Sequence, residues 1–187
     1  MDKKFANIEL YTPGIVIFDP AVLNGFLRQN NVADSNIFER FLSDEALGWS
    51  AIEQGVLIPI YEIPEDEYSV FIDDLPAGSA GKHALFEYNG LPLKIASGLA
   101  VIADLNALFD WDPDFFMNYK ANYPHRLASN DYLDVACGLF EVTVRGYTAL
   151  EAPFHSLGYG LEFKATENLP RVDEEVAVDD RDFTLQS

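Results

Sequence analysis

The chain is nearly free of cysteine. Its one thiol, Cys137, cannot form an internal disulfide, and no CxxC pair or Cys/His ligand spacing accompanies it. The histidines His83, His125 and His155 are scattered. These absences exclude a disulfide scaffold and the zinc sites that can be recognised from spacing, and they predict a reducing compartment, the cytoplasm.

Long apolar runs are also missing. The longest near the middle of the chain, 99–103, is far shorter than the roughly 20 residues that span a bilayer. Lys3 and Lys4 near the N-terminus are not followed by the apolar stretch that an export signal needs. We therefore expect neither a membrane segment nor export.

Basic residues are scarce. There are 12 Lys and Arg against 31 Asp and Glu, which gives a net charge of -19 and a pI near 4.2. Nucleic acid and anionic lipid would be repelled, because both need cations for binding. A basic protein would be attracted, at a rate that salt lowers. Acidity can equally serve solubility alone, and composition does not separate the two.

What is present suits one folded domain. The chain has 187 residues, of which 49% are hydrophobic, enough to bury a core without disulfide or metal support. Alternating patterns predict strands at 5–11, 14–18, 56–63, 68–72, 139–147 and 159–163. Helical spacing and capping residues predict a helix that begins at 19–20, a helical region over 35–54, and short helices at 104–108 and 112–119.

The connections add detail to this pattern. We expect 56–63 to pair with 68–72, 75–82 to be a loop, and Asn89-Gly90 to turn a β-hairpin. The last two strands should close the sheet. The prediction is a single α+β domain, 1–166, with a mainly antiparallel β-sheet and several short helices. An acidic C-terminal tail, 167–187, should be frayed or only loosely docked.

Motifs for chemistry are incomplete. Asp110, Asp112 and Asp114 imitate the start of a calcium loop, but Phe115 and Ala121 stand where Gly and Glu are needed, so a capped acidic turn is favoured. Residues 78–82 resemble part of a phosphate-binding loop, without its first Gly and its final Ser or Thr. Cys137 is interpreted as a small buried residue. We predict no enzyme, no metal and no cofactor.

Acidic stretches are the remaining signal. Residues 62–74 and 104–114 contain six and four acids without Lys or Arg, and 167–187 contains seven with two Arg. Aromatic residues stand in the middle stretch: Phe109, Phe115 and Phe116 are expected in the core, and Trp111 as an exposed anchor. The predicted partner-binding residues are Asp66, Glu67, Asp73, Asp74, Asp110, Trp111, Asp112 and Asp114.

Through these acidic stretches the chain resembles, as a class, the immunity proteins that bacteria make against secreted toxins. The resemblance implies a basic protein partner, a cognate toxin, whose active-site cleft the carboxylates cover. The alternative is a structural or secretion-system accessory protein that associates with itself, for example as a homo-oligomer. A third interpretation is an enzyme with a site around His83 and the loop 78–82.

Overall fold

Two β-sheets form the framework of the protein. The computed structural model describes residues 2–74, 83–172 and 181–185. Within them sheet A has the strand order β1-β4-β9-β8-β5 and sheet B the order β3-β2-β6-β7. All pairs are antiparallel except β4 with β9, which is parallel. The strands are β1 (Phe5–Glu9), β2 (Gly14–Phe18), β3 (Leu57–Tyr61), β4 (Glu67–Ile72), β5 (Phe86–Ile95), β6 (Leu99–Asp104), β7 (Asn130–Asp134), β8 (Gly138–Tyr147) and β9 (Leu157–Thr166).

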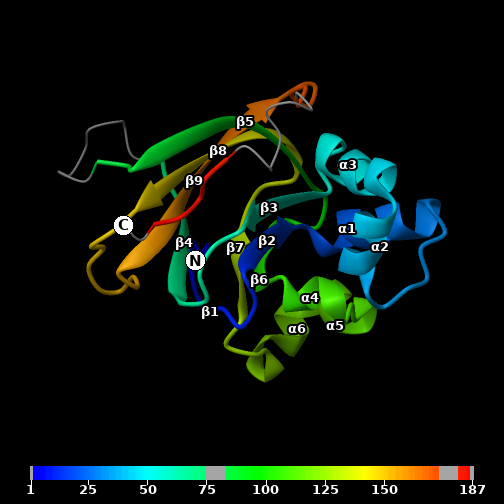
Figure 1. Cartoon of the computed structure of the whole chain (residues 1–187), viewed down its shortest axis with the longest axis horizontal. Helices are drawn as coiled ribbons and strands as arrows, with labels where there is room; N and C mark the ends of the chain where they lie inside the picture. The colour runs from blue at the N-terminus through cyan, green and yellow to red at the C-terminus, as the bar shows by residue number, and fades with distance from the viewer. Residues whose placement is uncertain (1, 75–82, 173–180, 186–187) are drawn as a thin grey trace.

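Short helices cover the outer face of sheet B (Figure 1). The expected α+β class with mainly antiparallel strands is confirmed. The helices are α1 (Pro20–Gln29), α2 (Ile37–Ser43), α3 (Glu45–Glu53), α4 (Asn106–Phe109), α5 (Pro113–Met117), α6 (Tyr119–Asn122) and a 3₁₀ turn, η1 (Tyr123–His125).

Sheet B is buried on both faces. Ile15 and Ile17 of β2 point toward sheet A, whereas Val16 and Phe18 point toward the helices, as the period-two geometry of a strand requires. All four side chains are fully buried. The structure therefore has three layers, sheet A, sheet B and helices, with a hydrophobic core on each side of sheet B.

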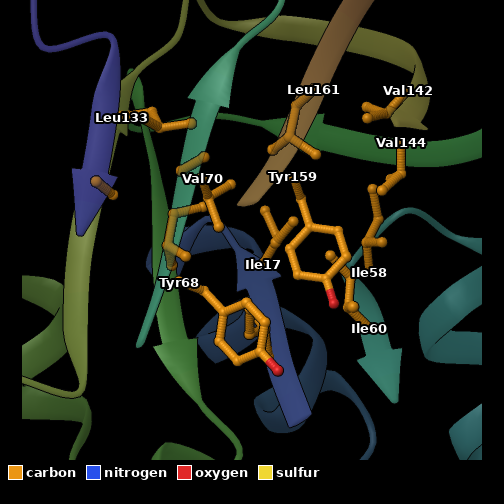
Figure 2. Packing of buried hydrophobic residues seen from close by; sticks show 14 of the residues in the cluster. Ile17, Ile58, Ile60, Tyr68, Val70, Leu133, Val142, Val144, Tyr159 and Leu161 are labelled. Atoms are coloured by element: carbon orange, nitrogen blue, oxygen red, sulfur yellow. The ribbon is translucent and has the colours of Figure 1, made fainter. Parts of the chain in front are cut away.

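The core between the sheets combines aliphatic side chains from both (Figure 2). Two tyrosines lie among them, Tyr68 of β4 and Tyr159 of β9, with ring centroids 5.7 Å apart. Their hydroxyls donate to the backbone carbonyls of Pro64 and Phe183. Each buried hydroxyl thus has the partner that burial demands.

The second core, between sheet B and the helices, is rich in aromatic side chains. Phe18 contacts Trp111 and Phe116 edge-on, and the rings of Trp111 and Phe116 stack at 5.0 Å. Trp111 is only 8% exposed. The prediction that Trp111 is an exposed anchor is wrong. Trp111 lies between the short helices α4 and α5, and its ring packs against Phe18 of sheet B.

Helix boundaries follow the capping residues. Asp19 accepts hydrogen bonds from the N–H groups of Ala21 and Val22 and begins α1. The predicted helical stretch 35–54 divides at Asp44, which ends α2 and caps α3. Gly55 then has φ +66°, the left-handed conformation expected of the residue that stops a helix.

The Asn89-Gly90 hairpin is not formed. Residues 86–95 make one strand, β5, paired along its length with β8. Tyr88 faces Val144 and Leu91 faces Val142, so Asn89 and Gly90 together oppose one residue, Thr143. This is a β-bulge, with Gly90 at φ +79°. The same dipeptide suits both structures, and pairing with the distant β8 decides between them.

Other expected pairings also differ. Strands β3 and β4 were expected to pair, but they belong to sheets B and A respectively. The acidic connection between them crosses from one sheet to the other. Strands β8 and β9 do pair, yet they lie inside sheet A and do not close it. Local patterns identify strands, whereas the choice of sheet depends on contacts far apart in the chain.

The described end of the C-terminal segment is firmly packed. Phe183 and Leu185 are 1% and 4% exposed and belong to the core between the sheets. The Tyr88 hydroxyl donates to the carbonyl of Asp182 at 2.9 Å. The prediction of a frayed or loosely docked tail is therefore wrong for residues 181–185.

The predicted loop 75–82 lies outside the described residues, as does the partial phosphate-binding motif within it. No helix in the described ranges is long and apolar enough to cross a membrane.

Buried tyrosines make stability sensitive to alkali. Burial, followed by the charge of Asp66, raises the pKa of Tyr68 to about 12, and burial also raises the pKa values of Tyr119 and Tyr159. The folded state therefore keeps protons that the unfolded chain loses near pH 10. This stabilisation is complete below pH 10 and disappears as the pH rises through the folded pKa. We expect the free energy of unfolding to fall between pH 10 and 12 in urea titrations.

The substitution Tyr68→Phe isolates one of these groups. Above pH 10, the free energy of unfolding of this variant should fall less steeply with pH, by up to about 1.4 kcal/mol per pH unit. An unchanged slope would show that Tyr68 does not titrate differently in the two states.

Candidate functional site: the acidic end

Three connections meet at one end of the molecule, those between β1 and β2, between β3 and β4, and between β6 and β7. Leu10 donates its N–H to the carbonyl of Asp66 at 3.0 Å, and Ile63 donates to Pro13 at 3.0 Å. These bonds join the β1–β2 and β3–β4 connections. The N–H of Glu9 donates to the carbonyl of Ala128 at 3.1 Å, which brings in the residues before β7. We call this surface, formed by residues 9–13, 62–67, 104–115 and 125–130, the acidic end.

Asp104 holds the acidic end together. Its carboxylate, 1% exposed, accepts from the N–H groups of Tyr11 (2.5 Å), Thr12 (3.1 Å) and Asn106 (2.7 Å), and from the Thr12 hydroxyl. The bonds connect the β1–β2 turn to the end of β6 and the start of α4. Asp104 thus has a positioning role, although it belongs to a stretch expected to face a partner.

The remaining carboxylates of this end face solvent. Asp110, Asp112 and Asp114 are exposed, and so are Glu62 and Glu65. In the described part of the chain, none of these five forms an ion pair with Lys, Arg or His. Arg126 is the one Lys or Arg in the four ranges that define this end, so carboxylates dominate its charge and give it a negative potential.

A pocket opens beside Asp110 and Asp112. It has a volume of about 210 Å³ and lies between α4, α5 and the residues that lead into β7. Its lining is partly apolar, through Phe115, Phe116 and Leu127, and Leu127 is 62% exposed. The lining residues are Ala103, Asp104, Asn106, Ala107, Asp110, Asp112, Phe115, Phe116, His125, Leu127, Ser129 and Asn130.

The predicted partner-binding residues separate into two groups. Asp66 and Glu67 lie at the acidic end with Asp110, Asp112 and Asp114, whereas Asp73 and Asp74 follow the opposite end of β4. A strand of six residues is about 20 Å long, so the single stretch 62–74 contributes to two surfaces.

Two of the predicted residues are buried. Asp73 is 5% exposed, accepts from the Tyr147 hydroxyl at 2.6 Å and pairs with Arg145 at 3.5 Å. Trp111 is enclosed by Phe18 and Phe116. Neither reaches a partner without unfolding its surroundings. Of the aromatic residues near Trp111, Phe116 is also buried, whereas Phe109 and Phe115 are half-buried.

The calcium-like sequence forms a helix cap. Asp112 accepts from the N–H of Phe115 at 3.0 Å and starts α5, which was the favoured interpretation. No group of three or more possible metal ligands occurs among residues 2–74, 83–172 and 181–185.

Cys137 is exposed, not buried as predicted, and its thiol donates to the carbonyl of Ala96 at 3.3 Å. His83 and His125 are exposed, and His155 forms a pair with Glu67 at 3.4 Å.

Sequence reasoning missed the apolar members of the site. Tyr11 is 63% exposed beside the β1–β2 turn, and its hydroxyl donates to Glu9 at 2.7 Å. Leu127, which lines the pocket, is also exposed. The position of Tyr11 next to Thr12-Pro13-Gly14 was a signal for exposure, whereas nothing in the sequence distinguishes Leu127 from a core leucine.

No protein-family model and no curated protein matches the chain. Two solved structures are similar in fold. One is the crystal structure of ComJ, inhibitor of the DNA degrading activity of NucA, from Bacillus subtilis, with 12% identity, a TM-score of 0.45, and 89% of this chain and 98% of that chain covered. The other is described as Crocagin biosynthetic gene J, with 13% identity, a TM-score of 0.47, and coverage of 87% and 98%. Both are too distant to transfer a function.

Proposed function

We propose that this protein binds a basic protein through its acidic end and inhibits it by covering a positively charged cleft, as an immunity protein does with a toxin. One observation carries the proposal: Asp110 and Asp112, exposed carboxylates that have no cationic partner in the described fold, line a pocket that also has apolar lining residues. Charges select and steer a partner, while apolar contacts that become buried supply affinity.

The rigidity of the acidic end favours tight binding. Asp104 and the backbone bonds between the connections fix the surface before the partner arrives. A surface that is already ordered loses less conformational entropy on association. Inhibition by coverage then needs no chemistry from this chain, only a match of shape and charge.

Charge reversal at Asp110 and Asp114 tests the proposal. Neither side chain has a hydrogen bond or ion pair in the described structure, so the fold should tolerate lysine there. The partner would first be captured from host lysate and secreted fraction at low and high salt, and identified by mass spectrometry. We expect Asp110→Lys/Asp114→Lys to lower the association rate constant roughly tenfold at low salt, with a weaker salt dependence.

A matched control carries the same charge change elsewhere. Glu53 ends α3 and Glu167 follows β9, at the end of sheet A opposite the acidic end. Glu53→Lys/Glu167→Lys should change the association rate little. Equal slowing by both double variants would reduce the effect to net charge, and unchanged association in the first would remove the acidic end from the function.

A further inference from the structure

The pocket at the acidic end is more than a group of acids. Ala103, Ala107 and Phe115 give it apolar lining from β6, α4 and α5. Asp104, which is buried, and Asp110 and Asp112, which are exposed, add three carboxylates. Apolar surface next to carboxylates is suited to a ligand that has an apolar body and a cationic head.

Its size restricts the ligand further. Pockets that enclose a cofactor or a drug-sized molecule usually measure about 300–1,000 Å³. At about 210 Å³ this one holds a smaller group, of the order of one long side chain. The lining contains no Lys or Arg, and His125 is its one basic residue against the carboxylates of Asp104, Asp110 and Asp112, so the pocket favours a cation over an anion.

We propose that the pocket receives one arginine side chain of the partner protein. This proposal rests on the proposed function and names the contact at its centre. The methylene stem of arginine would lie against Ala107 and Leu127, while the guanidinium group would reach Asp110 and Asp112. Buried anchors of this kind, arginine among the commonest, carry a large share of the energy of many interfaces.

Arginine fits better than lysine for two reasons. Its planar guanidinium has five N–H donors, enough to serve two carboxylates at once, whereas the lysine ammonium is a compact and strongly hydrated charge. Guanidinium groups also stack on aromatic faces, and Phe115, half-buried, lines the pocket. Asn106, which is exposed and lines the pocket, offers a further acceptor through its side-chain oxygen.

The test uses a small probe and the whole protein. The blocked tripeptide acetyl-Gly-Arg-Gly-amide would be titrated into ¹⁵N-labelled protein, with the citrulline and lysine tripeptides as matched probes. Citrulline keeps the shape of arginine without its charge. We expect amide shifts confined to the pocket, at Asn106, Ala107, Phe115 and Ser129, and at least tenfold weaker binding of both other peptides.

Two variants separate charge from space. Asp110→Asn/Asp112→Asn removes both charges and keeps the helix cap, since asparagine caps as well as aspartate. Ala107→Phe fills the pocket and leaves every charge in place. Each should weaken the arginine peptide at least tenfold, with the chemical shifts of sheet A unchanged as evidence of folding.

The outcomes are distinct. Small shifts spread over all acidic surfaces, unaffected by Ala107→Phe, would overturn the proposal, and so would equal binding of the citrulline or lysine peptide. If Ala107→Phe binds the captured partner normally while Asp110→Lys/Asp114→Lys binds slowly, the arginine pocket fails and the proposed function stands. If neither variant affects the partner, both fail.

Discussion

Replacing Asp19 with alanine should lower the free energy of unfolding by about 4 kcal/mol, one of the two largest losses we expect from a single substitution. The Asp19 side chain is fully buried and accepts five hydrogen bonds. Two come from the first turn of α1, and three come from Ala96 and Ser97, between β5 and β6. Alanine would remove the shared acceptor of these part-buried hydrogen bonds, and a donor that is left without a partner away from water costs about 1–3 kcal/mol.

The same motif elsewhere in the chain is a natural control. Asp112-Pro113 begins α5 as Asp19-Pro20 begins α1, but Asp112 is exposed, and among the described residues its carboxylate accepts only from the N–H of Phe115. Asp112→Ala should cost about 1 kcal/mol, the value of a cap alone. Urea unfolding of both variants measures the difference. Equal losses would mean that the bonds from Ala96 and Ser97 contribute nothing to stability.

Asp19 and Asp112 show which features of the fold can be predicted from the sequence and which cannot. Both Asp-Pro pairs predicted a helix start, and both predictions are confirmed, because a cap depends on residues two or three positions away. The second role of Asp19 depends on Ala96 and Ser97, which are 77 and 78 residues away. Nothing in the local pattern indicates it.

The candidate site was predictable to a similar extent. Acidity was visible in the sequence, and Asp110, Asp112 and Asp114 are exposed as a partner site requires. Which acids share a surface was not visible, since β4 separates Asp66 from Asp73 and the β1–β2 turn brings Asp66 to Leu10. The burial of Trp111 was not predictable either. Its neighbours in the sequence are acidic, but in the fold its ring contacts the aromatic rings of Phe18 and Phe116.

The outer face of sheet A carries the second large expected effect. Arg145 of β8, 15% exposed on its side chain, pairs with Glu87 of β5 at 2.6 Å, Glu162 of β9 at 2.5 Å and Asp73 at 3.5 Å. One cation thus joins three strands and the residue that follows β4. In a chain with net charge -19, such a cation offsets repulsion among carboxylates that the fold brings together.

Arg145→Met should therefore lower the free energy of unfolding by about 3 kcal/mol, measured by urea denaturation. Methionine retains the apolar stem but leaves Asp73, 5% exposed, with the Tyr147 hydroxyl as its remaining side-chain partner within residues 2–74, 83–172 and 181–185. Burial and then the hydrogen bond to Asp73 raise the pKa of Tyr147, so this hydroxyl stays a neutral donor and does not replace the lost charge.

A second substitution identifies the cause. Asp73→Asn removes the buried charge, so the double variant Asp73→Asn/Arg145→Met should recover at least half of the loss, giving a coupling energy above about 1 kcal/mol in the double-mutant cycle. Additive losses would assign the effect to packing of the arginine stem. The acidic end lies beyond the other terminus of β4, so partner binding by the folded double variant should stay unchanged. Stability and recognition would then depend on two separate sets of carboxylates, one paired inside the fold and one left for a partner.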